Sequence, residues 1–166
     1  MVQVVKDPIG SKGARLTTQL SIPSRHLVLL PDSSHRGISQ RIQDAHERDR
    51  LAQTLDAALE KSSMSGGFIV RTAAESQQGI DFLADVEFLR RSREQIEKKM
   101  TTAHAGDLIH ADLPLSLRVV RDLARDDVEK VRVDSRETFA MVRQFAIDLM
   151  PEMVDRIEYY PGERPI

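Results

Sequence analysis

The first third of the chain contains short runs of apolar and β-branched residues that favour β-strands. Residues 2–6 form a β-branched run, and turn-forming residues follow it. Apolar and polar side chains alternate over residues 16–22, so the two runs together predict a β-hairpin within residues 1–23. After Pro23, the apolar run 26–30 predicts a further strand.

A helical pattern replaces the alternation between residues 40 and 61. Its apolar side chains fall on one stripe, with charged residues on the other faces, which predicts a surface helix. The stripe consists of Leu51, Leu55, Ala58 and Leu59. Ser65, Gly66 and Gly67 end this pattern, and the run 68–72 predicts a buried strand whose last two residues are polar.

Helices and strands alternate in the rest of the chain. The pattern is helical from about residue 73 to residue 100, with a charged stretch that is typical of a solvated face, and residues 115–123 suit a short helix. Residues 130–133 suit a strand, Ser135 suits the cap of a helix that runs to about Leu149, and residues 154–160 suit a last strand. The whole pattern predicts an α+β fold with a mixed sheet.

Composition narrows the classes of function. The 166 residues are 40% hydrophobic and 30% charged, with a net charge of −2, so any binding of nucleic acid must depend on a local basic patch. The chain has no cysteine, which excludes disulfides and thiolate metal sites within it. No apolar run reaches the roughly 18–20 residues of a membrane span. We therefore expect a cytoplasmic protein with no membrane partner.

Several short motifs occur in a fixed order along the chain. They occupy residues 3–6, 12–18, 27–31, 37–42, 67–73, 131–135 and 160–165. In their order and spacing these motifs resemble the ribonuclease E/G family. The last two, Val-Asp-Ser at 133–135 and Gly-Glu-Arg-Pro at 162–165, favour the ribonuclease G side of that family.

The resemblance implies a domain organisation. In that family an OB-fold RNA-binding domain and a 5′-sensor domain are inserted into an RNase H-like subdomain, and a DNase-I-like subdomain with magnesium-binding aspartates follows. Residues 1–23 would be the last hairpin of the OB fold, 24–114 the 5′ sensor, and 115–166 part of the RNase H-like subdomain. We therefore expect an internal piece of such an enzyme, with no catalytic residue, metal ligand or cofactor of its own. Mg²⁺ would belong to the complete enzyme.

The resemblance also assigns a phosphate site. The family places an Arg-Thr pair at the end of a strand to grip an RNA 5′-monophosphate, and Arg71 and Thr72 match that pair. A guanidinium can donate two parallel hydrogen bonds to phosphate oxygens, and a hydroxyl adds a third donor. The alternative from the residues alone is an arginine that pairs with a surface carboxylate at a strand end.

Five further residues match binding positions of the family. Val28 matches a residue that packs against the terminal base, although it also suits a core strand. Ser24 stands where the family has glycine, and we expect its backbone N–H to be a donor. Arg41 belongs to a motif that contacts phosphate. Lys6 and Lys12 match basic residues that follow the RNA backbone, although lysines beside a hairpin turn are usually just solvated.

A cluster of metal-ligand types offers a different interpretation. His104, Asp107, His110 and Asp112 lie within nine residues, but their spacing matches no helical zinc site or known loop signature, which favours a polar connector. Two carboxylate pairs, Asp134 with Glu129 and Asp126 with Asp127, could likewise suggest a two-metal site. Nothing in the sequence makes either pair converge.

The sequence therefore predicts an RNA-binding, 5′-monophosphate-sensing part of a ribonuclease E/G-like endoribonuclease that acts in RNA processing and decay. Its expected partner is single-stranded RNA with a 5′-monophosphate end. A structural or oligomer-contact module with no RNA affinity of its own, including a homo-oligomer, is the alternative.

Overall fold

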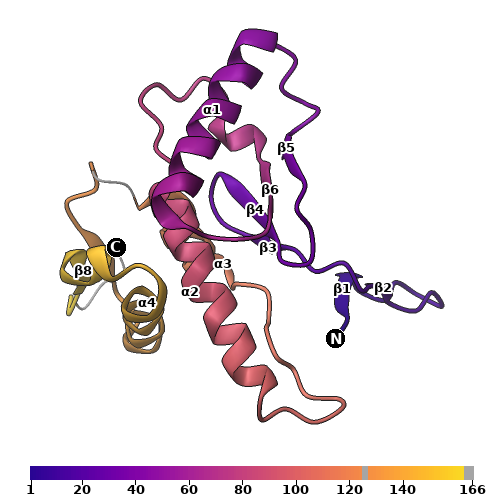
Figure 1. The fold of residues 1–166 in the computed structure, drawn as a ribbon. Helices are drawn as coiled ribbons and strands as arrows, with labels where there is room; N and C mark the ends of the chain where they lie inside the picture. Colours follow the sequence, from indigo (N-terminus) through magenta and orange to yellow (C-terminus); the bar gives the residue numbers. More distant parts are fainter. Residues whose placement is uncertain (125–126, 163–166) are drawn as a thin grey trace. The chain divides into compact units, whose positions relative to one another are not determined.

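The computed structural model describes residues 1–124 and 127–162 and has two compact units, residues 1–90 and 91–166 (Figure 1). Each unit combines helices with strands, so the predicted α+β class is confirmed. Asp126 and the end of the last family motif, residues 163–165, lie outside the described residues. The domain boundaries taken from the resemblance stay predictions. None of the helices in the described ranges is both long and apolar enough to cross a membrane.

The predicted N-terminal hairpin is present. Strand β1 (Gln3–Lys6) pairs antiparallel with β2 (Arg15–Thr17), and the register shifts between Val4 and Lys6. The second strand is shorter than the alternation over 16–22 suggested. The Gln3 side chain explains part of this, because it bonds to the backbone N–H and C=O of Ser21 at 2.9 and 3.0 Å and so occupies the groups of that residue that could otherwise join a ladder.

A four-stranded sheet forms the centre of the first unit. Its strands are β3 (Ile22–Pro23), β4 (Leu27–Leu30), β5 (Arg36–Ile38) and β6 (Gly67–Val70), in the order β3-β4-β6-β5. Strands β4 and β6 are antiparallel, whereas β5 runs parallel to β6. The sequence pattern predicted β4 and β6 but missed β5. Arg36 and Gly37 give that strand no apolar run.

Helix α1 (Ala45–Ser62) carries the predicted apolar stripe, and all four of its members are buried. The helix begins later than residue 40. The Asp44 side chain accepts a hydrogen bond from the Glu47 N–H at 2.7 Å and so caps the first turn. At the other end, Ser63 adopts the left-handed conformation and donates its N–H to the Leu59 carbonyl.

Gly67 begins β6 where two backbones approach closely. A Cβ at this position would lie 2.8 Å from the His35 carbonyl oxygen and 3.0 Å from Ser33 Cβ. The next residue, Phe68, donates its N–H to the same His35 carbonyl at 2.8 Å. Glycine therefore lets β6 dock against the segment that leads into β5.

The helix predicted from residue 73 begins only at Leu83, so the predicted start was wrong. Residues Thr72–Ala74 form a 3₁₀ turn, η1, and Ser76 and Gly79 then have φ of 59° and 66°, which ends any helical path. Helix α2 (Leu83–Met100) starts afterwards, where the Asp81 side chain accepts the Leu83 N–H at 2.9 Å. Helical periodicity is averaged over a whole segment, so it does not reveal single residues in the left-handed conformation.

The second unit follows its predicted pattern closely. It contains α3 (Leu115–Leu123), β7 (Val131–Val133), α4 (Arg136–Leu149), the 3₁₀ helix η2 (Pro151–Arg156) and β8 (Ile157–Tyr159). Strands β7 and β8 are parallel, and α4 packs against both. The last strand is shorter than predicted, because the 3₁₀ turn that begins at Pro151 runs on to Arg156.

Candidate functional site

Arg71 directly follows β6, and the turn before β4 holds it in place. Its backbone N–H donates to the His26 carbonyl at 2.7 Å. Its side-chain Nη1 donates to the carbonyls of Ser24 and Arg25, the latter at 3.1 Å. Backbone and side chain of Arg71 are therefore both fixed by the carbonyls of three consecutive residues.

The rest of the Arg71 guanidinium is uncommitted. Within residues 1–124 and 127–162, no carboxylate lies within 4 Å of it, and neither Nε nor Nη2 makes a hydrogen bond. The side chain is half-buried, so its charge is only partly solvated. This arrangement does not support an arginine paired with a surface carboxylate. It leaves one edge of the guanidinium with two parallel N–H donors.

Thr72 follows Arg71 in the sequence and carries a hydroxyl group. It is the first residue of η1, and its carbonyl accepts the Glu75 N–H at 3.0 Å. Its hydroxyl makes no hydrogen bond to any other described residue. Within the described ranges, the Arg-Thr pair therefore has N–H and O–H donors on adjacent residues that make no other hydrogen bond, and such donors can bind phosphate oxygens.

Val28 occupies the less buried face of the sheet. It lies opposite Ile69 in the antiparallel β4–β6 pair, and both are half-buried, whereas Leu27 and Val70 are fully buried. Side chains two residues apart on an extended strand share a face, and Arg71 is extended with φ −84° and ψ 159°. The sheet thus places an apolar side chain on the same face as the guanidinium.

Ser24 supports Arg71 from within the turn. Its own N–H donates to the Leu27 carbonyl at 2.8 Å, and its hydroxyl is hydrogen-bonded to the same backbone. The N–H is therefore already occupied, contrary to the expectation that it would be a donor for a ligand. What Ser24 contributes is its carbonyl, which accepts from Arg71 Nη1.

Arg41 follows the C-terminal end of β5, which lies at the same end of the sheet as the C-terminal end of β6. Strands β5 and β6 are parallel, Ile38 pairs with Val70, and the Ser39 N–H donates to the Val70 carbonyl at 2.9 Å. The chain just before Arg41 therefore runs beside Val70, the last residue of β6. Arg41 itself is exposed, and it makes no ion pair with any described residue.

Arg48 also contributes to this part of the structure, although none of the sequence motifs contains it. From α1 its Nη1 donates to the carbonyls of Ser39 and Ile42 at 2.8 and 3.0 Å, and so it fixes the turn that contains Arg41. An arginine on the polar face of an amphipathic helix has no pattern that distinguishes this role. Only the position of the turn reveals it.

Comparison with known proteins identifies the family. The model of the ribonuclease E/G family matches residues 21–166. The chain belongs to the ribonuclease E/G family. It is 41% identical over its whole length to ribonuclease G of Escherichia coli K12 and 40% identical to ribonuclease G of Haemophilus influenzae. Ribonuclease E of a Nostoc species is 34% identical over 145 residues, which cover 87% of this chain and 21% of that relative.

The chain spans about a third of the length of these ribonuclease G relatives, 33% in both cases. The resemblance drawn from the short motifs is thereby confirmed at the level of the family. The roles of individual residues stay predictions, because neither the match nor the relatives' names assign them.

Lys6 and Lys12 of this ribonuclease E/G family chain lie on the hairpin, not on the sheet that carries Arg71. Both are exposed. The backbone of Lys12 bridges to Ile9 at the tip of the hairpin, with both hydrogen bonds at 3.1 Å. The two lysines therefore belong to a two-stranded sheet that is separate from the four-stranded sheet that leads to Arg71.

The other clusters show no metal centre within residues 1–124 and 127–162. In the described ranges, no three His, Asp or Glu side chains come together in a way that could hold an ion. His104 lies 3.8 Å from Asp107, but its ring is 91% exposed. One member of the second carboxylate pair, Asp126, lies outside the described residues.

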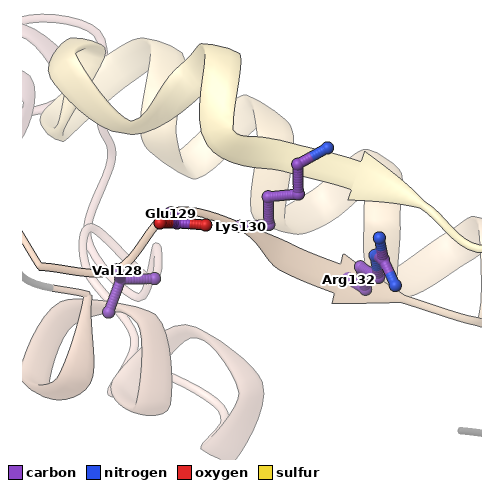
Figure 2. Close-up of a pocket in the computed structure, with 4 residues that line it drawn as sticks. All are labelled: Val128, Glu129, Lys130 and Arg132. Atoms are coloured by element: carbon purple, nitrogen blue, oxygen red, sulfur yellow. The ribbon is translucent and has the colours of Figure 1, made fainter.

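One shallow hollow of the second unit is lined by Val128, Glu129, Lys130 and Arg132 (Figure 2). Glu158 accepts from Lys130 at 2.6 Å and lies 3.6 Å from Arg132. These two cations lower the pKa of the Glu158 carboxyl, with the Lys130 hydrogen bond as the largest cause. The positive charge of this hollow is thus partly neutralised, unlike that of Arg71.

Proposed function

We propose that this chain is the RNA-binding, 5′-monophosphate-sensing part of a ribonuclease E/G enzyme that acts in RNA processing and decay. The proposal rests on the contacts and the remaining N–H donors of Arg71. Its guanidinium is anchored through Nη1 and has no carboxylate partner in the described ranges, and within the same ranges the hydroxyl of the next residue, Thr72, makes no hydrogen bond.

The geometry suits a terminal phosphate for two reasons. A monophosphate carries roughly −1.5 to −2 charges near neutral pH, which an unpaired guanidinium stabilises strongly. Because Nη1 is already bonded, the Nε–Nη2 edge is held ready, and less side-chain entropy is lost when the ligand binds. Val28, on the same face, would contact the terminal base.

The complete enzyme would cleave single-stranded RNA by metal-assisted hydrolysis. Its relatives bear the names ribonuclease G and ribonuclease E, and Mg²⁺ is the ion that the family resemblance implies. The side chains of the described ranges form no carboxylate group that would hold Mg²⁺.

Binding of two short single-stranded RNAs that differ only in a 5′-monophosphate or a 5′-hydroxyl tests the proposal. The wild-type chain should prefer the phosphate. A charge-assisted hydrogen bond contributes about 1.5–3 kcal/mol, so Arg71→Ala should weaken binding of the phosphorylated RNA by on the order of tenfold or more. Arg71→Lys should recover only part, since an ammonium lacks the planar pair of donors.

Arg143→Ala is the matched control. Arg143 is exposed on α4 and forms no ion pair with a described residue, so this variant removes the same charge from a different place. It should leave the preference for the phosphate intact. Equal losses for both RNAs in Arg71→Ala would make Arg71 a general backbone contact. No loss for either RNA, with a lowered melting temperature, would make it a structural tie of the turn before β4.

The salt dependence gives an independent check. Each phosphate that a protein neutralises adds to the slope of log affinity against log salt concentration. A site centred on one terminal phosphate should show a shallow slope, and Arg71→Ala should reduce it further. A steep slope that is unchanged in Arg71→Ala would indicate contacts spread along the RNA backbone.

A further inference from the structure

A buried histidine and a buried aspartate join α2 to the turn before β4. One carboxylate oxygen of Asp85 accepts the backbone N–H of His26 at 2.9 Å, and the other lies 2.8 Å from His26 Nδ1. Both side chains are 8% exposed. Asp85 therefore holds both the backbone and the ring of a residue that is 59 positions away in the sequence.

The contacts of this pair define its charge state. Burial by itself raises the pKa of the Asp85 carboxyl. The hydrogen bonds from the His26 ring and backbone, with a smaller effect of the nearby Ser24 hydroxyl, outweigh burial and bring the pKa below its ordinary value of 3.8. Asp85 is thus an ionised acceptor at neutral pH, and the hydrogen that it accepts from the ring is on Nδ1. His26 Nε2 is buried and has no hydrogen-bond partner among the described residues.

The same turn also holds Arg71. The His26 carbonyl accepts the Arg71 N–H, while the carbonyls of Ser24 and Arg25 accept from Arg71 Nη1. Asp85 therefore fixes residue 26 from α2, while residues 24–26 fix the guanidinium. All of these groups lie in the first compact unit.

We propose that Asp85 is a positioning residue for the phosphate site, acting through His26 to fix the carbonyls that aim the Arg71 guanidinium. A buried carboxylate is costly unless it is fully hydrogen-bonded. Here that carboxylate is bonded to the one turn that carries the Arg71 acceptors. The phosphate as ligand rests on the proposed function, whereas the coupling of Asp85 to Arg71 does not.

Asp85→Asn is the first test, because it keeps the side-chain volume and removes one acceptor. Affinity for the 5′-phosphorylated RNA should fall about threefold to tenfold, the scale of one ordinary hydrogen bond. Affinity for the 5′-hydroxyl RNA should not change. Asp81→Asn is the control. Asp81 also accepts a hydrogen bond at the start of α2, from Leu83, but it is exposed.

A second variant guards against misfolding. His26→Phe removes the ring donor but keeps an aromatic ring and the backbone N–H bond to Asp85. It should reduce the phosphate preference in the same direction as Asp85→Asn. Thermal unfolding of each variant shows whether the fold is retained.

Amide hydrogen exchange without RNA tests the coupling directly. The Arg71 amide donates to the His26 carbonyl, so it should exchange faster in Asp85→Asn and at the wild-type rate in Asp81→Asn. An unchanged Arg71 amide in Asp85→Asn would overturn the inference. An unchanged phosphate preference in Asp85→Asn would also overturn it, provided that Arg71→Ala abolishes the preference in the same assay. A wild-type chain without phosphate preference would instead overturn the proposed function, and exchange at Arg71 would still decide the coupling.

Discussion

The carboxylate of Glu47 holds the loop that follows η1. It accepts two hydrogen bonds from Arg50, at 2.8 and 2.7 Å, and one from the Ser76 N–H at 2.9 Å. The Arg50 hydrogen bond is the largest cause, and the Ser76 N–H the next, that lower the pKa of Glu47 from 4.5 to about 2. Ser76 has a positive φ, so this bond stabilises an unfavourable backbone conformation.

Glu47→Gln should therefore destabilise the fold in a pH-dependent way. A carboxyl whose pKa is lower in the folded state stabilises the fold fully above its unfolded pKa, and loses that contribution as the pH falls. The window here runs from pH 4.5 down to about 2. The difference in free energy of unfolding between wild type and Glu47→Gln should be largest at pH 7 and smaller at pH 3.5.

Urea unfolding at these two pH values measures the effect. Glu60→Gln provides the control, because Glu60 is exposed on the same helix and has no ion pair with a described residue. It should show little change at either pH. A difference for Glu47→Gln that stays constant with pH would mean that the hydrogen bonds of Glu47 do not depend on its charge.

At the scale of the element, the caps decide where helices begin. Helix α4 starts at Arg136 because the Ser135 hydroxyl accepts the Thr138 N–H at 3.2 Å. Its inward face then buries Val142, Phe145 and Leu149. The cap and the predicted end of this helix are both confirmed.

Ser135→Ala should lower the free energy of unfolding by about 0.5–2 kcal/mol, since it leaves first-turn N–H groups without a protein acceptor. Ser135→Asp should keep most of the stability, because a carboxylate both caps the helix and favours its positive end. Chemical unfolding followed by circular dichroism measures both variants. If Ser135→Asp were as unstable as Ser135→Ala, the hydroxyl would matter for a contact other than the cap.

At the scale of the whole molecule, the β1–β2 hairpin has few contacts that would stabilise it. In the described ranges its two strands pair only with each other, and Val4, Val5 and Leu16 are each more than half exposed. A two-stranded hairpin alone is marginally stable in water. Its free edges can also accept a strand from another chain.

Residues 3–17 should therefore exchange their amide hydrogens much faster in the monomer than Leu27–Leu30 of β4, which pairs on both sides. Exchange followed by mass spectrometry, on a sample shown to be monomeric, measures this directly. Slow exchange of the hairpin in a proven monomer would contradict the prediction. Protection that appears only with rising protein concentration would indicate that the hairpin pairs with a second copy.

Several elements could be predicted without a structure, because their sequence signal is local. The α1 stripe, the Ser135 cap and the apolar strands β4 and β6 follow from periodicity, capping chemistry and β-propensity, all of which act over a few neighbouring residues. The ordered motifs, Arg71 and Thr72 among them, also placed the chain in its family without a structure.

Other features depend on residues that are far apart in the sequence, and they became visible only in the fold. Strand β5 has no apolar run and exists because β6 offers it hydrogen-bond partners. Arg71 is aimed by carbonyls that lie 46 and 47 residues away, and His26 is held by Asp85 across 59. Such pairings are chosen by burial and by the need to satisfy buried polar groups, which no local pattern encodes.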